Sequence, residues 1–216
     1  MQEPKVRLPK ALSPSEVDNM DIECYDWGED WSRVFGNPAL TGIWMVWGDS
    51  GSGKTSFCLQ LAKELSKYGK VIYNSLEQGR RSLTMQQAMR RSQMSALPKG
   101  AFRLTCEEMD VLSARLSRKH SPDIAIIDSI QYTGFRVKDL FEFKRKHANK
   151  LIIFVSQIKN GEPDGAVAKK AKFDSDLKIY LQGYRAFSRG RTMGDDPNAY
   201  YTIWEEGAAR YWIDKE

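Results

Sequence analysis

Apolar residues in the first three-quarters of the chain follow two alternating patterns. Continuous apolar runs, typical of strands buried on both faces, occur at residues 43–47, 124–128 and 151–155, with a further strand expected at 70–74 and a shorter one at 102–105. Between the runs, apolar residues recur at helical spacing over residues 54–68, 82–95, 107–119 and 137–147. Strands that alternate with helices predict an α/β fold, with a mostly parallel, twisted sheet covered by helices on both faces.

The pattern changes after residue 156. Residues 157–175 include Gly161, Pro163 and Gly165, and we expect them to form a loop. The remaining chain resembles strands joined by turns, expected at residues 176–182, 184–189, 199–205 and 209–213. These strands would extend the parallel sheet with an antiparallel part.

The N-terminal segment differs from the rest. Residues 1–20 are rich in proline and charge, which indicates an extended arm or, alternatively, a floppy tail. The aromatic residues that follow, Tyr25, Trp27, Trp31 and Phe35, would pack on the body of the protein. We therefore expect residues 1–41 to be an arm and packing segment, a candidate oligomerisation element, and residues 42–216 to form the core domain.

Composition limits the possible classes of protein without identifying one. The net charge is +5, which suits a polyanionic partner, although many basic proteins have none. Cys24, Cys58 and Cys106 show neither a disulfide framework nor metal-ligand spacing, which favours a reducing compartment. The sequence has no apolar run long enough to span a membrane and no signal-peptide core at its start. We expect a soluble, cytoplasmic protein.

One motif carries specific chemistry. The run from residue 48 to 55, Gly-Asp-Ser-Gly-Ser-Gly-Lys-Thr, fits the phosphate-binding loop at every defined position, and it lies between a predicted strand and a predicted helix. The nucleotide-binding residues we expect are Gly48, Asp49, Ser50, Gly51, Ser52, Gly53, Lys54, Thr55 and Ser56. Lys54 would reach the β- and γ-phosphates of ATP, and the Thr55 hydroxyl would bind Mg²⁺. The alternative is a plain glycine-rich turn.

Two acidic residues stand at the ends of predicted strands. Asp128 closes the run Ile124–Ile127 and fits the second metal-supporting carboxylate that a Mg²⁺-assisted hydrolase needs. Glu77 follows the second strand, near the expected position of the phosphates, and is a candidate base for the attacking water. Either residue would otherwise be an ordinary strand-end carboxylate.

Four segments together resemble the RecA-like P-loop ATPases, in particular the RadA and DnaB-type helicase branches. They are residues 48–55, Ser75-Leu76-Glu77, Ile126-Ile127-Asp128-Ser129-Ile130-Gln131 and Val155-Ser156-Gln157, and the resemblance covers roughly residues 42–191. It implies that Glu77 activates water. It also implies that Gln157 senses the γ-phosphate and couples it to the DNA-binding loops.

In such proteins two loops contact DNA. The first corresponds to residues 132–138, with Arg136 and Lys138, and Tyr132 or Phe135 could stack on bases. The second follows Gln157, and its candidate DNA-binding residues are Lys159, Lys169, Lys170 and Lys172. The lysines suit contacts with a phosphate backbone without sequence readout, whereas a solvated lysine-rich loop is the alternative.

The resemblance also bears on assembly. Arg189 and Arg191 lie where the family carries fingers that reach the nucleotide of the next subunit, so they imply a homo-oligomer, ring or filament; otherwise they are surface arginines. The sequence shows no counterpart of the zinc-finger and protease-like domains of RadA, its Lys-Asn-Arg-Phe-Gly run, or the helical domain of the helicases. We therefore expect a core-only member.

The sequence thus predicts an oligomeric ATPase with ATP and Mg²⁺ between subunits, acting on DNA, expected to be single-stranded and bound without sequence specificity. Two alternatives remain. The first is an ATP-driven switch that acts on a protein partner. The second is a P-loop small-molecule kinase, with a lid supplied by Arg80, Arg81, Arg90 and Arg91.

Overall fold

The computed structural model describes residues 10–190, 194 and 196–213. Its helices are α1 (Pro14–Asp18), α2 (Glu29–Phe35), α3 (Lys54–Leu65), α4 (Leu83–Arg91), η1 (Met94–Ala96), α5 (Met109–Leu116), η2 (Ile130–Tyr132), α6 (Val137–Lys146), α7 (Ala166–Asp174) and α8 (Glu205–Trp212). Its strands are β1 (Gly42–Gly48), β2 (Val71–Ser75), β3 (Phe102–Thr105), β4 (Ile124–Asp128), β5 (Leu151–Ser156), β6 (Ile158–Lys159), β7 (Glu162–Pro163), β8 (Leu177–Gln182), β9 (Arg185–Ser188) and β10 (Tyr200–Thr202).

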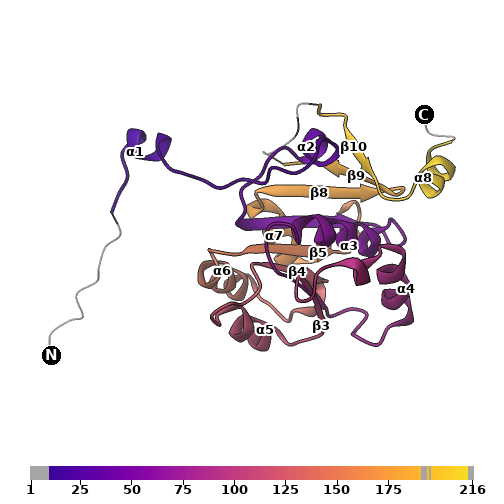
Figure 1. The fold of residues 1–216 in the computed structure, drawn as a ribbon, viewed down its shortest axis with the longest axis horizontal. Helices are drawn as coiled ribbons and strands as arrows, with labels where there is room; N and C mark the ends of the chain where they lie inside the picture. The colour runs from indigo at the N-terminus through magenta and orange to yellow at the C-terminus, as the bar shows by residue number, and fades with distance from the viewer. Residues whose placement is uncertain (1–9, 191–193, 195, 214–216) are drawn as a thin grey trace.

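An eight-stranded sheet forms the centre of the molecule, in the order β10-β9-β8-β1-β5-β4-β2-β3 (Figure 1). The strands from β8 to β3 are parallel, and β9 and β10 continue the sheet antiparallel. The predicted α/β fold with an antiparallel extension is confirmed. Because the six parallel strands point the same way, their carboxyl ends, and the loops after them, meet at one edge of the sheet.

Helices cover both faces of the sheet. On one face, α2, α3 and α4 pack on a buried cluster that includes Trp44 and Val46 of β1. On the other face, α5, α6 and α7 pack on a second cluster that includes Met45 and Trp47 of the same strand. Successive residues of a strand point to opposite faces, so an apolar strand such as β1 supplies both cores.

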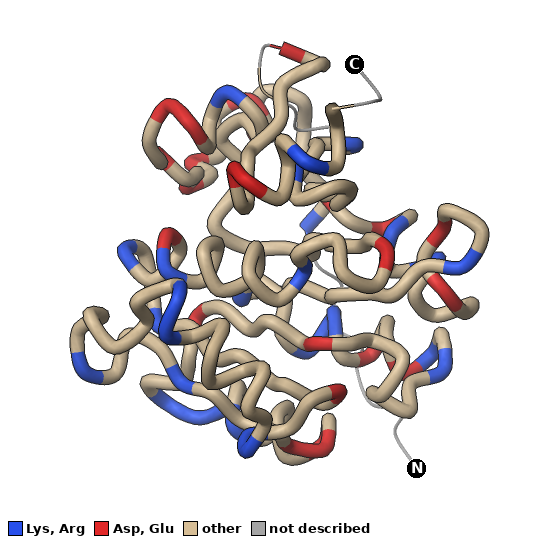
Figure 2. The backbone as a smooth tube through the Cα atoms, turned by 90° about the vertical axis from the view of Figure 1, so that its right-hand side faces the viewer, with Lys and Arg blue, Asp and Glu red and all other residues tan. Residues whose placement is uncertain are grey.

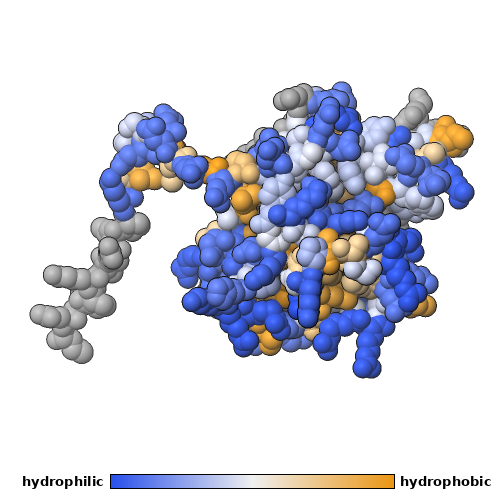
Figure 3. All heavy atoms as spheres, viewed as in Figure 1, coloured by the Kyte–Doolittle hydropathy of each residue, from blue (hydrophilic) through white to orange (hydrophobic). Residues whose placement is uncertain are grey.

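The N-terminal aromatic residues belong to the first of these cores. Tyr25 and Trp27 are stacked at 5.4 Å between ring centroids, and Trp31 is stacked at 4.4 Å on Tyr201. The segment before them is different, because α1 stands away from the body (Figure 1) and its surroundings carry the exposed apolar residues visible on the arm in Figure 3. The domain boundary at residue 41 remains a prediction.

Two sequence predictions are wrong. Residues 157–175 are not an open loop, because they contain the β6–β7 hairpin and the helix α7. This segment is rich in alanine and lysine, which are good helix formers, and it buries Ala168 and Ala171 against the sheet. Residues 209–213, predicted as a strand, lie mostly in α8, which has acidic residues in its first turn and buries Gly207 and Ala208. The strand expected at 199–205 is reduced to β10.

No helix in the part of the chain that the structure describes is long and apolar enough to cross a membrane.

Candidate nucleotide-binding site

The predicted phosphate-binding loop connects β1 to α3 at the carboxyl edge of the sheet. Gly51 and Gly53 have φ angles of 76° and 96°, in the left-handed region that glycine adopts readily. A side chain at Gly48 would place its Cβ 2.4 Å from the carbonyl oxygen of Leu181, so this position also requires glycine. By contrast, a Cβ at Gly51 would meet nothing within 4 Å, so the loop leaves open space in front of its tip.

The donors around that space suit a phosphate group. Thr55 and Ser56 lie in the first turn of α3, where backbone N–H groups and the helix dipole favour an anion. Within the described residues, the buried Ser52 Oγ has no hydrogen-bond partner. Lys54 Nζ donates to the carbonyl oxygens of Gly48 at 2.9 Å and of Asp49 at 2.7 Å, so its ammonium group is held at the loop. Burial lowers the pKa of Lys54, while the charges of Asp128 and Glu77 oppose this effect.

Asp128 lies at the end of β4, opposite Ser75 of β2 in the register of the two strands. Its side chain is buried and accepts a hydrogen bond from the Tyr73 hydroxyl, with 2.5 Å between Oη and Oδ2. Burial raises the pKa of Asp128 to about 6, although the Tyr73 hydrogen bond and the Lys54 charge act in the opposite direction. The hydrogen bond occupies Oδ2, which leaves Oδ1 as the oxygen that can serve a metal ion or its water.

Glu77 and Gln157 come together from different strands. Gln157 Nε2 donates to Glu77 Oε1 at 3.0 Å, which joins the segment after β5 to the segment after β2. The Glu77 backbone N–H also donates to the carbonyl oxygen of Asp128 at 3.1 Å. The sequence-predicted candidates from β2, β4 and β5 therefore lie at one edge of the sheet, beside the loop that follows β1.

Three polar residues of the site received no role from the sequence. Gln78 Nε2 donates to Thr55 Oγ1 at 3.3 Å. Gln131 Nε2 donates to Ser156 Oγ at 2.7 Å and to the carbonyl oxygen of Asp164 at 2.9 Å. The third is Tyr73, which lies on the same face of β2 as Ser75. Only Gln131 had a signal in the sequence, since it belongs to the motif that begins at Ile126.

The predicted arginine fingers lie elsewhere. Arg189 is exposed just after β9, and its backbone N–H donates to the carbonyl oxygen of Lys178 at 2.7 Å, near the start of β8. Because β8 runs parallel to β1, the start of β8 lies at the edge opposite the phosphate loop. The Arg189 backbone therefore lies toward the edge of the sheet away from the phosphate loop of its own chain. Arg191 lies outside the described residues.

The predicted DNA-binding residues fall into two groups. Arg136 and Lys138, at the start of α6, form ion pairs with Asp139 at 3.3 Å and with Glu142 at 3.7 Å. In the second group, Lys159 is exposed on β6, and Lys169, Lys170 and Lys172 lie on α7 rather than on a flexible loop.

Two of the α7 lysines have partners in their own chain. Lys170 pairs with Asp174 at 3.0 Å. Lys172 pairs with Glu162 at 2.7 Å, and its Nζ lies 4.6 Å from the centre of the Trp47 ring. These contacts tie Lys172 to the β7 hairpin and to β1, whereas Lys169 is exposed to solvent.

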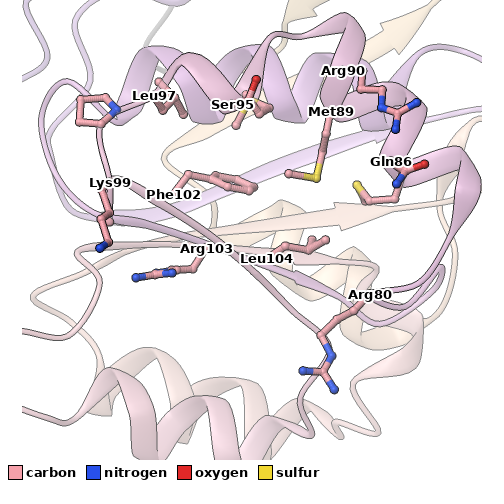
Figure 4. A pocket seen from close by; sticks show the side chains of 14 residues that line it. Arg80, Gln86, Met89, Arg90, Ser95, Leu97, Lys99, Phe102, Arg103 and Leu104 are labelled. Carbon is pink, nitrogen blue, oxygen red and sulfur yellow. The ribbon is translucent and has the colours of Figure 1, made fainter.

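Two cavities are relevant to the arginines near α4. A cavity of about 570 Å³ lies beside the phosphate loop and is lined by Ser56, Gln60, Arg91, Ser92, Tyr184, Ile203 and Trp204. A second, of about 500 Å³, lies between α4, η1 and the edge strand β3, with Met89, Phe102 and Leu104 inside and Arg80, Arg90, Lys99 and Arg103 around it (Figure 4). Lys and Arg are also frequent in the lower part of Figure 2. Arg80 and Arg90 thus line the β3 cavity rather than the one beside the loop.

A phosphate loop after the central strand, a carboxylate at the end of β4 and parallel strands on both sides of β1 define a P-loop nucleotide-binding protein. No protein-family model matches the chain. Two curated proteins are similar in sequence, both DNA repair protein RadA. The Haemophilus influenzae protein is 24% identical over 213 residues, covering 92% of this chain and 45% of its own. The Streptococcus pneumoniae protein is 34% identical over 105 residues, covering 48% of this chain and 24% of its own.

The chain therefore spans less than half the length of these relatives. The fold is shared with solved structures, two of which each match 83% of this chain. The flagellar accessory protein FlaH from Methanocaldococcus jannaschii has a TM-score of 0.55 at 18% identity, with 92% of that chain covered. A KaiC-like protein from Pyrococcus horikoshii has a TM-score of 0.59 at 15% identity, with 98% covered. The chain has the RecA-like P-loop fold that its sequence motifs predicted.

Proposed function

We propose that this protein binds and hydrolyses ATP at the carboxyl edge of its sheet and uses the hydrolysis to act on DNA. The observation that carries the proposal is the convergence of four strand ends, with the Glu77–Gln157 hydrogen bond of 3.0 Å beside the phosphate loop. The cavity of about 570 Å³ that begins at Ser56 offers room for the nucleoside.

The residues present fit a Mg²⁺ ion. Thr55 Oγ1 accepts one hydrogen bond from Gln78 and keeps a second lone pair, and Asp128 keeps Oδ1. Thr55 and Asp128 would hold the ion or its waters, and oxygen ligands of this kind are the ones that Mg²⁺ prefers. When bound, the ion neutralises charge on the phosphates.

Each remaining side chain has a role in the proposal. Lys54 neutralises phosphate charge, and Glu77 accepts a proton from the attacking water. Gln157 donates to Glu77 and so holds the base in place. Gln157 directly precedes β6. A change in its hydrogen bonding at the γ-phosphate would therefore shift the backbone of residues 158–164, which contain the β6–β7 hairpin.

The proposal includes a homo-oligomer, in which Arg189 or Arg191 acts on ATP held by a neighbouring subunit. Arg189 lies at the sheet edge opposite its own phosphate loop, which suits action in trans and not in cis. The DNA part rests on the RadA similarity and on the basic residues of α6 and α7. A cytoplasmic location, where DNA and ATP meet, belongs to the same proposal.

A protein-directed switch is the second candidate function. It is favoured by the finding that Lys170 and Lys172, two of the expected DNA contacts, have acidic partners in their own chain. The kinase alternative has less support, because Arg80 and Arg90 line a cavity away from the phosphate loop, and of the four expected lid arginines the cavity beside the loop has Arg91 in its lining.

The test of the proposed active site is Glu77→Gln, which keeps the size of the side chain and removes the base. We expect ATP to bind as before and turnover to fall by about 100-fold or more, the usual range for losing general base catalysis. Glu108→Gln, an exposed position before α5, is the matched control. Turnover of Glu77→Gln equal to that of the control would remove Glu77 from the mechanism.

A further inference from the structure

Two phenylalanine side chains are unusually exposed on neighbouring helices. Phe173 of α7 is 72% exposed and Phe141 of α6 is 43% exposed. Lys170 Nζ lies 4.9 Å from the centre of the Phe173 ring and 5.2 Å from the centre of the Phe141 ring. One ammonium group in contact with both rings shows that the two aromatic faces belong to one patch.

The surroundings of the patch are basic. Helix α6 contains four basic and two acidic residues, and α7 contains three basic and one acidic. Two of these three acidic groups, Glu142 of α6 and Asp174 of α7, form ion pairs with Lys138 and Lys170 within the patch. A hollow of about 500 Å³ adjoins Phe141 and is lined by Lys138, Phe141, Glu142, Lys144, Arg145 and Ala148.

We propose that Phe141 and Phe173 form a base-stacking platform for single-stranded DNA, with the basic residues of α6 around it contacting the phosphates. This inference rests on the proposed DNA-directed function and adds two aromatic residues, Phe141 and Phe173, that the sequence analysis did not include among the DNA contacts. Flat apolar rings surrounded by cations match a polyanion with exposed base faces. An uncharged protein partner would leave the excess of positive charge without a partner, and duplex DNA keeps its bases stacked on one another.

The geometry favours a rigid platform. Both rings are attached to helices that pack against the sheet core through Leu140, Phe143, Ala168 and Ala171. Lys170 is held by Asp174 and by the two rings, so its position is fixed before DNA arrives. A platform that is already in place loses little side-chain entropy on binding.

Lys172 has a different role from its neighbours. Its ammonium group lies over Trp47 and pairs with Glu162, so we assign it to holding α7 on the sheet rather than to DNA. We therefore expect α7 to contact DNA through Phe173, near the end of the helix, at a position beyond the lysines that the sequence analysis selected.

The experiment measures the affinity of the protein for a fluorescently labelled oligothymidylate, in the presence of ATP and Mg²⁺. Stacking on one aromatic side chain is worth about 1–3 kcal/mol per base, so Phe173→Ala should weaken binding by about 5- to 150-fold. Phe141→Ala, from a less exposed ring, should have a smaller effect in the same direction. Phe173→Trp should keep the affinity of the wild-type protein, because it keeps an aromatic face.

Leu83→Ala is the matched control, since Leu83 is an equally exposed apolar residue, at 67%, on α4. DNA-independent ATP hydrolysis should be unchanged in all these variants, because neither ring lies in the nucleotide site. Unchanged ATP hydrolysis therefore shows that each variant is folded.

The two levels of the proposal fail differently. Wild-type protein that binds the oligonucleotide while Phe141→Ala/Phe173→Ala binds it equally well would overturn the platform and leave the DNA function intact. Wild-type protein that hydrolyses ATP but binds no oligonucleotide would overturn the DNA function and the platform with it. Loss of binding in Leu83→Ala to the same extent would show that the effect is not specific to the patch, and would overturn it as well.

Discussion

The carboxyl edge of the sheet and the α6–α7 surface use polar residues in opposite ways. At the sheet edge, Lys54, Asp128, Glu77 and Gln157 each bond to another group of the site, and Asp128 is buried. On α6 and α7, basic side chains pair with acids one turn away or lie over aromatic rings at the surface. The edge is built to hold one small ligand in a defined position, whereas the helical surface suits an extended partner that can bind in many registers.

The largest effect we expect comes from removing the loop lysine. Lys54→Ala should lower the affinity for ATP by about 10- to 100-fold, the worth of a charge-assisted hydrogen bond, and should abolish turnover. Lys63→Ala, on the same helix α3, is the control and should leave both unchanged. Titration with a fluorescent ATP analogue checks the affinity. Retention of wild-type affinity by Lys54→Ala would contradict a phosphate-binding role.

Asp128 should show a trade-off between activity and stability. Its folded-state pKa of about 6 lies above the ordinary value of 3.8, so the stability it contributes is full below about pH 4 and is lost as the pH rises through 6. Asp128→Asn should therefore abolish turnover yet raise the free energy of unfolding at pH 8 by up to about 3 kcal/mol. Urea unfolding without nucleotide at pH 4 and pH 8 measures this. A variant that is less stable than wild type at pH 8 would contradict the burial cost assigned to Asp128.

Tyr73→Phe tests the hydrogen bond on Asp128 without opening a cavity. Because the buried Asp128 Oδ2 loses its only described side-chain donor, we expect stability to fall by about 1–3 kcal/mol at pH 8. We also expect a higher Mg²⁺ concentration for half-maximal turnover, because the carboxylate is no longer held in one orientation. An unchanged Mg²⁺ dependence would limit Tyr73 to a purely structural role.

The smallest effects should separate two lysines of one helix. Lys172→Ala should cost about 1 kcal/mol of stability, since it removes a partly exposed ion pair with Glu162 and a contact with the Trp47 ring, and should change DNA affinity little. Lys169→Ala should do the reverse, leaving stability unchanged and weakening DNA binding a few-fold with a shallower salt dependence. Thermal unfolding and a salt titration of binding distinguish them. An equal loss of DNA affinity in both variants would contradict the separation.

The sheet and its loop edge were predictable because their determinants are local. A buried strand such as Ile124–Asp128 is a continuous apolar run, and the loop glycines follow a fixed spacing, so both appear directly in the sequence. Glu77 and Gln157 were predicted one at a time from strand ends and family resemblance, but their mutual hydrogen bond depends on the register of three strands.

The rest depends on tertiary contacts. Gly161, Pro163 and Gly165 indicated a loop, and the helix α7 that follows them forms where Ala168 and Ala171 can be buried. The pattern of strands joined by turns predicted a strand at 209–213, but Trp212 ends a helix and donates from Nε1 to the carbonyl oxygen of Gly183 at 3.1 Å. Tyr73 was unremarkable in a strand sequence, because only the pairing of β2 with β4 brings its hydroxyl to Asp128.

The most direct test of the central claim is ATP hydrolysis by the purified protein with Mg²⁺, measured with and without single-stranded DNA at low and moderate salt. We predict Mg²⁺-dependent hydrolysis that DNA stimulates, with less stimulation at the higher salt because phosphate contacts are screened. Hydrolysis indifferent to DNA would contradict the DNA-directed function and favour the protein-directed switch. No hydrolysis under any of these conditions would contradict the assignment of the sheet edge as an ATP-hydrolysing site.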